Sequence, residues 1–219
     1  MKTTALSFLP PPNAVEGRGE SPISALSALS ALLLALALTG CATPPATRYY
    51  SLAPGVVASP ASTLQIEVPT IALPERLVRP QLVVRSAANP FEVLDQHRWA
   101  ASFDSELRDA LASGITQQLG AIDVTAGGRL SSQPVYRIAV QLRQWDAAVD
   151  SQVQASFSWT IRRSDGTRNL ACQWTQSEAV GPGIAALAQG AQRLTSRAAQ
   201  SMAASVKALD ANAAATCPS

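Results

Sequence analysis

Residues 135–147, VYRIAVQLRQWDA, decide the fold, because apolar and polar side chains alternate over most of the stretch. Similar alternation appears at residues 153–163, VQASFSWTIRR, and at residues 170–180, LACQWTQSEAV. A period of two places every second side chain on the same face of a strand, so each stretch predicts a strand with one buried face. Asp165-Gly166, after the second stretch, is a typical hairpin turn. Together they predict a three-stranded meander.

Two segments with a helical period flank the meander. In residues 102–120 apolar side chains recur at three and four positions, Ser102 is a candidate N-cap, and Gly120 can end the helix. Residues 184–209 have the same helical period and many alanines. A turn predicted at residues 181–183 precedes this helix. Both segments therefore predict amphipathic helices that pack on the sheet.

Shorter strands are predicted outside the meander from brief alternating or β-prone stretches. They are residues 48–52, 64–68, 81–85, 91–94 and 122–125, with turn residues at 87–90 making a hairpin of the third and fourth. Strands, helix, meander and helix predict an α+β fold. We expect an antiparallel or mixed β-sheet with the two amphipathic helices packed on one face.

The amino-terminal region resembles a bacterial lipoprotein leader. The apolar run from Ile23 to Leu38 has no charge and is shorter than the roughly 20 residues of a membrane-spanning helix. Thr39-Gly40-Cys41 follows it, with the small residues that a processing peptidase needs before a lipidated cysteine. We therefore predict lipid attachment at Cys41. By resemblance to enterobacterial sorting, Ala42 favours the outer membrane. An ordinary cleaved signal peptide and a short membrane anchor are the alternatives.

The remainder predicts one domain behind a tether. Residues 1–40 form the leader, residues 41–63 are rich in Ala, Pro, Ser and Thr, and residues 64–219 have the length of one domain. An extended tether of this composition reaches ~3 Å per residue, which would hold the domain several nanometres from the membrane. Without the leader the charge is 15 basic against 13 acidic residues, or +2, and this balance does not predict nucleic-acid binding.

The three cysteines divide between two roles. If Cys41 carries lipid, Cys172 and Cys217 form an even pair in an oxidising periplasm. We predict a disulfide between them, because Cys217 lies two residues from the terminus, where a free apolar side chain has little reason to be. Two buried free thiols are the alternative.

The sequence offers little for catalysis. His97 is the only histidine, no Gly-x-Ser-x-Gly motif occurs, and Cys172 and Cys217 are too far apart for a Cys-x-x-Cys site. Pro182 lacks the N–H that a phosphate loop needs at the 181–183 turn. We therefore expect no catalytic residue, no metal and no cofactor, and we interpret His97 as a capping or surface residue.

One set of short motifs resembles a known family. Along the chain, the lipidation motif is followed by Tyr49-Tyr50-x-Leu, by LPERLVRPQLVVR at residues 73–85, by Arg98-Trp99-Ala100 before the first helix, and by the Ala-rich last helix. This order resembles the PqiC family of auxiliary lipoproteins of ABC-type intermembrane lipid transporters, and the likeness spans Cys41 to Leu209. The motifs are short, so their order and spacing carry the likeness.

The resemblance implies a partner. In such systems an inner-membrane permease and ATPase act with an MCE-type protein whose tunnel carries phospholipid, and the lipoprotein would dock that tunnel to the outer membrane. Candidate docking residues are Arg76, Arg79 and Arg98, since arginine makes bidentate contacts at interfaces. Self-association is left open. The alternative function is a lipoprotein regulator of a cell-envelope enzyme, because tethered lipoproteins also activate peptidoglycan synthases.

Overall fold

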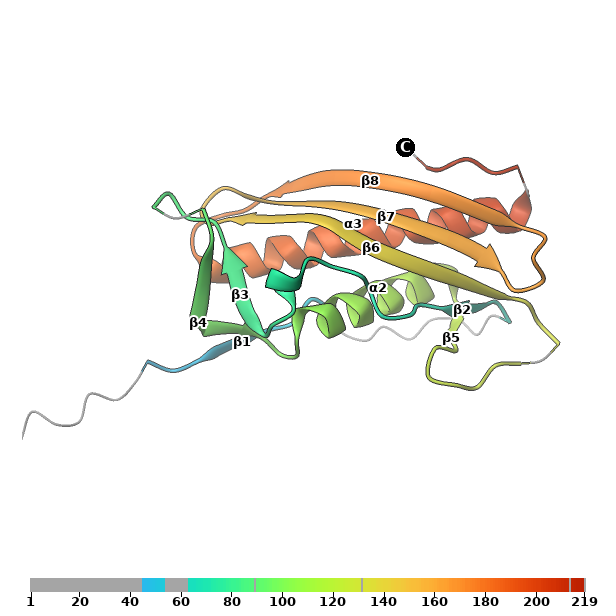
Figure 1. The fold of residues 1–219 in the computed structure, drawn as a ribbon, viewed down its shortest axis with the longest axis horizontal. Helices are drawn as coiled ribbons and strands as arrows, with labels where there is room; N and C mark the ends of the chain where they lie inside the picture. The colour runs from blue at the N-terminus through green and yellow to red at the C-terminus, as the bar shows by residue number, and fades with distance from the viewer. Residues whose placement is uncertain (1–44, 54–62, 89, 131, 213, 219) are drawn as a thin grey trace, which may run out of the picture. The chain divides into compact units, whose positions relative to one another are not determined.

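The structure is a computed structural model that describes residues 45–53, 63–88, 90–130, 132–212 and 214–218 (Figure 1). The chain divides into two compact units, residues 1–45 and residues 46–219. All described helices and strands belong to the second unit. The predicted leader and Cys41 lie outside the described residues.

The meander is the centre of a five-stranded mixed sheet with the order β5-β2-β6-β7-β8. Its antiparallel part consists of β6 (Val135–Ala148), β7 (Gln152–Arg163) and β8 (Asn169–Ala179). Two short strands, β2 (Gln65–Glu67) and β5 (Ile122–Asp123), complete the sheet in parallel orientation. With the helices described below, this arrangement confirms the α+β class.

A bulge in β6 changes the side-chain alternation that the sequence suggests. The pairing with β7 shifts between Leu142 and Gln144, so Arg143 is an extra residue. One additional residue reverses which positions face the core. Gln144 is therefore exposed, whereas Trp145 is buried. The regular alternation expected through Gln144 was wrong at this one point.

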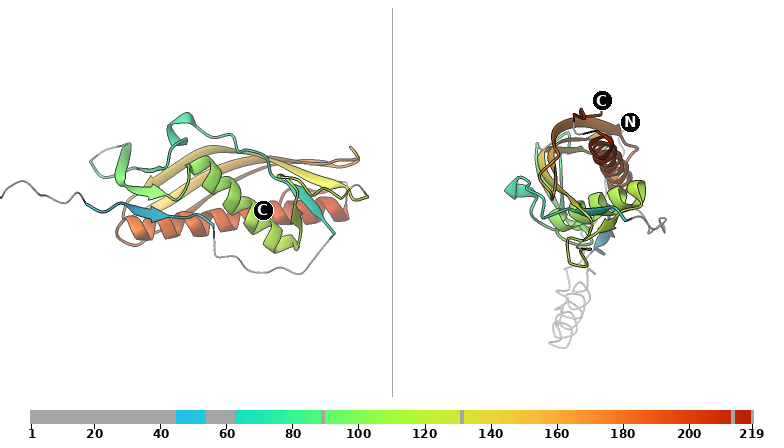
Figure 2. Two further views of the ribbon diagram at one scale, coloured as in Figure 1. Left: turned by 90° about the horizontal axis from the view of Figure 1, so that it is seen from below. Right: turned by 90° about the vertical axis from the view of Figure 1, so that its right-hand side faces the viewer.

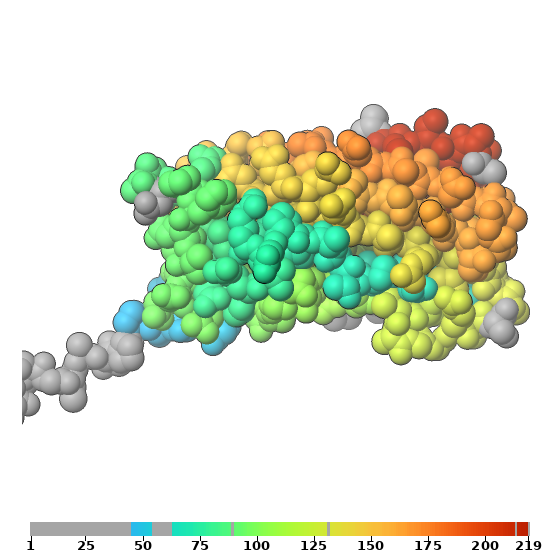
Figure 3. Space-filling model, viewed as in Figure 1, coloured from blue at the N-terminus to red at the C-terminus, as the bar shows by residue number. Residues whose placement is uncertain are grey.

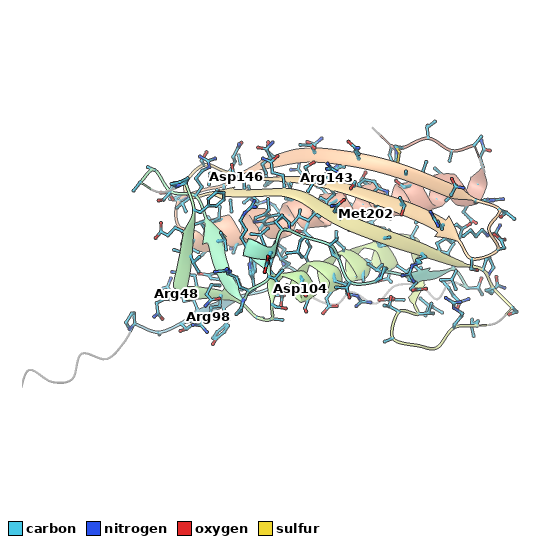
Figure 4. All side chains as sticks on the ribbon, viewed as in Figure 1. Arg48, Arg98, Asp104, Arg143, Asp146 and Met202 are labelled. Atoms are coloured by element: carbon cyan, nitrogen blue, oxygen red, sulfur yellow. A yellow bond between two sulfur atoms is a disulfide. The ribbon has the colours of Figure 1, made fainter. Side chains whose placement is uncertain are left out.

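Two helices lie on the same side of the five-stranded sheet (Figure 2). They are α2 (Phe103–Leu119) and α3 (Ile184–Ala211). Gly120 ends α2 in the left-handed conformation at φ 61°, as its sequence position predicts. The apolar stripe predicted on α3 is buried: Leu187, Ala191, Leu194, Ala198, Met202 and Val206 (Figure 4). The two helices also pack against each other, where α2 carries Gly114 and α3 carries Ala199.

A second sheet has three strands in the order β1-β4-β3, and we call it the small sheet. It consists of β1 (Arg48–Tyr50), β3 (Gln81–Val84) and β4 (Glu92–Trp99), with a 3-10 turn, η1 (Glu75–Leu77), before β3. The hairpin was predicted to stop at residue 94. Strand β4 continues to Trp99 because parallel β1 pairs with its second half.

Three aromatic rings join the small sheet to the rest of the fold. Trp99 at the end of β4 lies 5.6 Å from Phe103 in the first turn of α2, measured between ring centroids. Phe103 in turn meets Trp145 of β6 edge to face at 5.0 Å. All three side chains are buried. Trp99 therefore anchors the start of α2 to the small sheet.

The segment from Arg48 to Leu52 is part of the folded unit rather than of a tether. Leu52 is completely buried, and the Ala100 N–H donates to the Tyr50 carbonyl at 2.7 Å. The sequence assigned residues 41–63 to the tether, although it noted a β-prone patch at residues 48–52. Burial of Leu52 makes this patch part of the folded unit.

The carboxyl end of α3 is fastened to the sheet. The Tyr136 hydroxyl donates to Asp210 at 2.5 Å, and burial together with this hydrogen bond raises the pKa of Tyr136 to about 12. A disulfide joins Cys172 of β8 to Cys217 beyond the helix. The cross-link closes a loop with a sequence separation of 45 residues, which the chain-entropy model converts to about 4 kcal/mol of stabilisation before any strain.

The close contact between the helices gives the first prediction. A Cβ added at Gly114 would lie 2.7 Å from the Cβ of Ala199, closer than packed atoms approach. Gly114→Ala should therefore lower the free energy of unfolding by about 1–3 kcal/mol through overpacking, despite the better helix propensity of alanine. Urea denaturation measures this change. Gln118→Ala, at an exposed position of α2, is the control and should change stability by less than about 0.5 kcal/mol.

Candidate partner-binding site

The three arginines proposed for docking belong to the small sheet or to the turn before it. Arg76 lies on η1, Arg79 follows η1, and Arg98 lies on β4. They do not form one cluster. The Arg76 guanidinium stacks 5.1 Å from the ring centroid of Phe91, which precedes β4, whereas Arg98 lies near the other end of that strand.

Arg98 lies opposite Tyr49 of β1 and Gln81 of β3 in the strand pairing. Its Nε donates to the Asp95 carbonyl at 3.0 Å. Figure 4 labels Arg48 of the neighbouring strand near the same end of β4; it pairs with His97, so its side chain leaves the opposite face of the small sheet from that of Arg98. No carboxylate pairs with either guanidinium within 4.0 Å among the described residues. Both side chains therefore keep donors for another molecule.

Arg79 is half-buried, and its backbone supports the start of α2. The Phe103 N–H donates to the Arg79 carbonyl at 3.2 Å, and the neighbouring Pro80 carbonyl accepts from the Trp99 N–H at 2.7 Å. The Arg79 Nε is buried and has no hydrogen-bond acceptor within the described part of the chain. The Pro-bracketed turn thus connects the small sheet to α2 while leaving a donor of Arg79 unused.

His97 has a structural contact. A hydrogen bond of 2.8 Å joins its Nδ1 to the Tyr50 hydroxyl, and the two rings stack with centroids 5.8 Å apart. The contact ties β1 to β4. The sequence placed His97 beside a helix start; the structure places it within β4 because that strand is longer than predicted.

Glu106 has a structural role that the sequence interpretation missed. Its carboxyl group accepts from the Leu52 N–H at 2.9 Å and from the Ser51 hydroxyl at 3.0 Å, and the side chain is nearly buried. The available signal was its position, because Phe103, Glu106, Leu107 and Ala110 share the stripe that faces the core.

The hollows of the domain differ in size and openness. A half-open apolar pocket lined by Leu77, Trp99, Phe103, Trp145 and Leu187 has a free volume of about 10 Å³, which is room for about one water molecule. A wider hollow of about 670 Å³ opens on the outer face of β6, β7 and β8 and is lined by polar and small side chains. The apolar pocket is therefore too small for an acyl chain.

The described residues were also searched for metal-binding groups and for membrane-spanning helices. They contain no group of three or more His, Cys, Asp and Glu side chains arranged to hold a metal ion. None of their helices combines the length and the apolar character needed to span a bilayer.

Comparison with known proteins identifies the family of this chain. Residues 50–203 match the family model described as the ABC-type transport auxiliary lipoprotein component. The chain belongs to this family. The match covers most of the chain and confirms the resemblance inferred from the short motifs, and it includes Arg76, Arg79 and Arg98. A search of curated proteins found no relative.

Two solved structures share the fold of this family member. One is the crystal structure of an uncharacterised protein, with a TM-score of 0.59 and 16% identity, covering 74% of this chain and 99% of the other. The second is protein XCC0632 from Xanthomonas campestris, assigned to DUF330, with a TM-score of 0.50 and 15% identity over 72% of this chain and 90% of the other. At these identities the comparison concerns the fold alone.

Glu106 gives the second prediction. Glu106→Ala should leave the buried Leu52 N–H without an acceptor and release the segment that carries β1, at a cost of about 1–3 kcal/mol. Hydrogen exchange should then accelerate across residues 48–53 while β6 and β7 stay protected. Glu106→Gln keeps an acceptor oxygen and should show a smaller effect. Unchanged exchange in Glu106→Ala would mean that the aromatic cluster alone holds the segment.

Proposed function

We propose that this auxiliary lipoprotein is a non-catalytic subunit of an ABC-type lipid transport system, anchored to the outer membrane through Cys41. It would dock the periplasmic end of an MCE-type protein to that membrane. The observation that carries the proposal is the family match over residues 50–203, together with the lipidation motif that ends at Cys41. An auxiliary role agrees with a fold that buries its apolar residues in a continuous core.

A docking role fits the structure better than a lipid-carrying role. The apolar pocket beside Trp99 has room for about one water molecule, whereas an acyl chain needs a much larger apolar volume. Lipid would therefore travel through the partner. The auxiliary subunit would hold the partner at a fixed place on the membrane. A folded α+β unit attached to a lipid by a few residues is suited to that task.

The anchor lies close to the folded unit. From Cys41 to Ala46 there are five residue steps, which span at most about 18 Å when fully extended. This is shorter than the several nanometres expected from a tether over residues 41–63. The docked end of an MCE protein would consequently sit near the membrane surface rather than deep in the periplasm.

Cys41 provides the third prediction. Cys41→Ala should leave the protein unprocessed or outside the outer membrane, because two or more acyl chains are needed for a stable anchor. Membrane fractionation and the mass of the amino-terminal peptide measure this. Ala42→Asp is the matched control: it should keep the lipid but change the sorting. A processed Cys41→Ala protein firmly held in the outer membrane would contradict the lipidation.

The arginines provide the fourth prediction. Charge reversal at Arg79 or Arg98 should weaken co-purification with an MCE protein several-fold, because each guanidinium has donors without a protein carboxylate. Crosslinked membranes and quantitative mass spectrometry give the readout. Arg143→Glu, at an exposed position on the bulge of β6, should leave co-purification unchanged.

The double variant Arg79→Glu/Arg98→Glu separates two outcomes. If it is folded and still co-purifies with the partner, the docking face lies elsewhere on the domain. If the unmodified protein brings down no MCE protein and instead brings down a peptidoglycan enzyme, the transport assignment itself is wrong.

A further inference from the structure

We infer that the outer face of the small sheet contacts the phospholipid headgroup layer of the membrane that holds the protein. This inference rests on the proposed lipid anchor at Cys41 and goes beyond it, because an anchor alone requires no contact between the folded domain and lipid. The surface is defined by Tyr49 on β1, Phe91 and Val93 at the start of β4, and Arg98 at the end of β4.

Large apolar side chains are unusually exposed around this sheet. Tyr49 is 65% exposed, Phe91 63%, Val78 52% and Val93 42%. These four account for most of the exposed large apolar residues in the described chain; the others are Ile122 and Leu130. Exposed apolar residues that gather on one surface mark a contact with a partner or a membrane.

The strand pairing puts these side chains on one face. Trp99 and its partner Tyr50 face the core, so the preceding pair, Arg98 and Tyr49, faces outward. In the other half of β4, Leu94 pairs with buried Leu82, which turns the neighbouring Val93 outward. The outer face therefore carries apolar and aromatic side chains beside a cation.

The chemistry of the face suits the membrane interface. Tyrosine has an apolar ring and a polar hydroxyl, and arginine can bury its stem while its head stays with water or phosphate. The Arg76 guanidinium over Phe91 combines the same two groups. Basic and acidic side chains nearly balance in this region, so the proposed contact does not depend on a net positive charge. The basic residues are Arg48, Arg76, Arg79 and Arg98, and the acidic residues are Glu75, Glu92 and Asp95.

The length of chain before β1 selects lipid as the occupant. Tyr49 is eight residues after Cys41, so it lies within about 30 Å of the lipid attachment point even if the chain between them is fully extended. In the ribbon, β1 and β4 lie at one end of the folded unit, while the loop with Leu130 lies at the other (Figure 1). Figure 3 shows the surface of the first end in blue and green. An anchor this short holds that end nearest the bilayer.

A fluorescent probe tests the contact in the full lipidated chain. Val93→Cys is labelled with an environment-sensitive fluorophore and placed in vesicles of phosphatidylethanolamine and phosphatidylglycerol. The disulfide between Cys172 and Cys217 and the lipid on Cys41 keep the native cysteines from reacting. Leu130→Cys is the matched control, because Leu130 has a similar exposure, 46% against 42%.

The contact predicts different quenching at the two positions. Nitroxide-labelled phospholipid should quench the Val93 probe several-fold more strongly than the Leu130 probe, and aqueous iodide should show the opposite order. Adding Tyr49→Ser to Val93→Cys should weaken the lipid quenching. Equal quenching at the two positions would overturn the contact, and a Val93 probe shielded from both quenchers would assign the face to a protein instead.

The mass of the amino-terminal peptide separates this test from the anchoring proposal. A lipidated protein whose Val93 probe reports water would overturn the membrane contact alone and leave the anchor intact. A protein without lipid on Cys41 would overturn the anchor, and this inference with it.

Discussion

The stack of Trp99, Phe103 and Trp145 is the contact on which the rest of the structure depends. It brings together the end of β4, the first turn of α2 and the second half of β6. Aromatic pairs at these separations add about 0.5–1.5 kcal/mol each beyond the burial of their surface. A second link lies after β3, where the Arg85 N–H donates to the Ala147 carbonyl at 2.8 Å and the Arg85 guanidinium pairs with Asp146 of β6.

The stack forms only because β6 is irregular. With continuous alternation Trp145 would share the exposed face with Arg143, and the extra residue in the bulge turns it toward Phe103. The bulge thus has a consequence for the partner-binding region as well as for the core. It fixes the small sheet, and with it Arg98 and the exposed aromatic residues, relative to the helices.

The elements that rest on a repeating sequence pattern could be predicted, whereas the features that depend on a single contact could not. Alternation over residues 135–180 and the helical period after Gly183 identify the meander and α3, because each rests on many side chains. The separation into two sheets, the bulge at Arg143 and the burial of Glu106 each depend on a contact between distant segments. Local sequence carries little of that information. The three arginines proposed for docking remain a prediction; the structure places Arg76 on η1, Arg79 after it and Arg98 near the end of β4, a separation that depends on how far β4 extends.

Burial of Glu106 connects the fold to the anchor. Its carboxyl group holds Leu52, and Leu52 fixes the strand through which the chain enters the domain. A pull on Cys41 would therefore act on a core hydrogen bond and a buried leucine after only a few residues of free chain. A long tether would let the domain move independently of the membrane. A short connection would instead fix the position of the domain relative to the membrane. In the proposed arrangement, the same short connection would hold the subunit near the membrane and would bring its exposed aromatic face within reach of lipid.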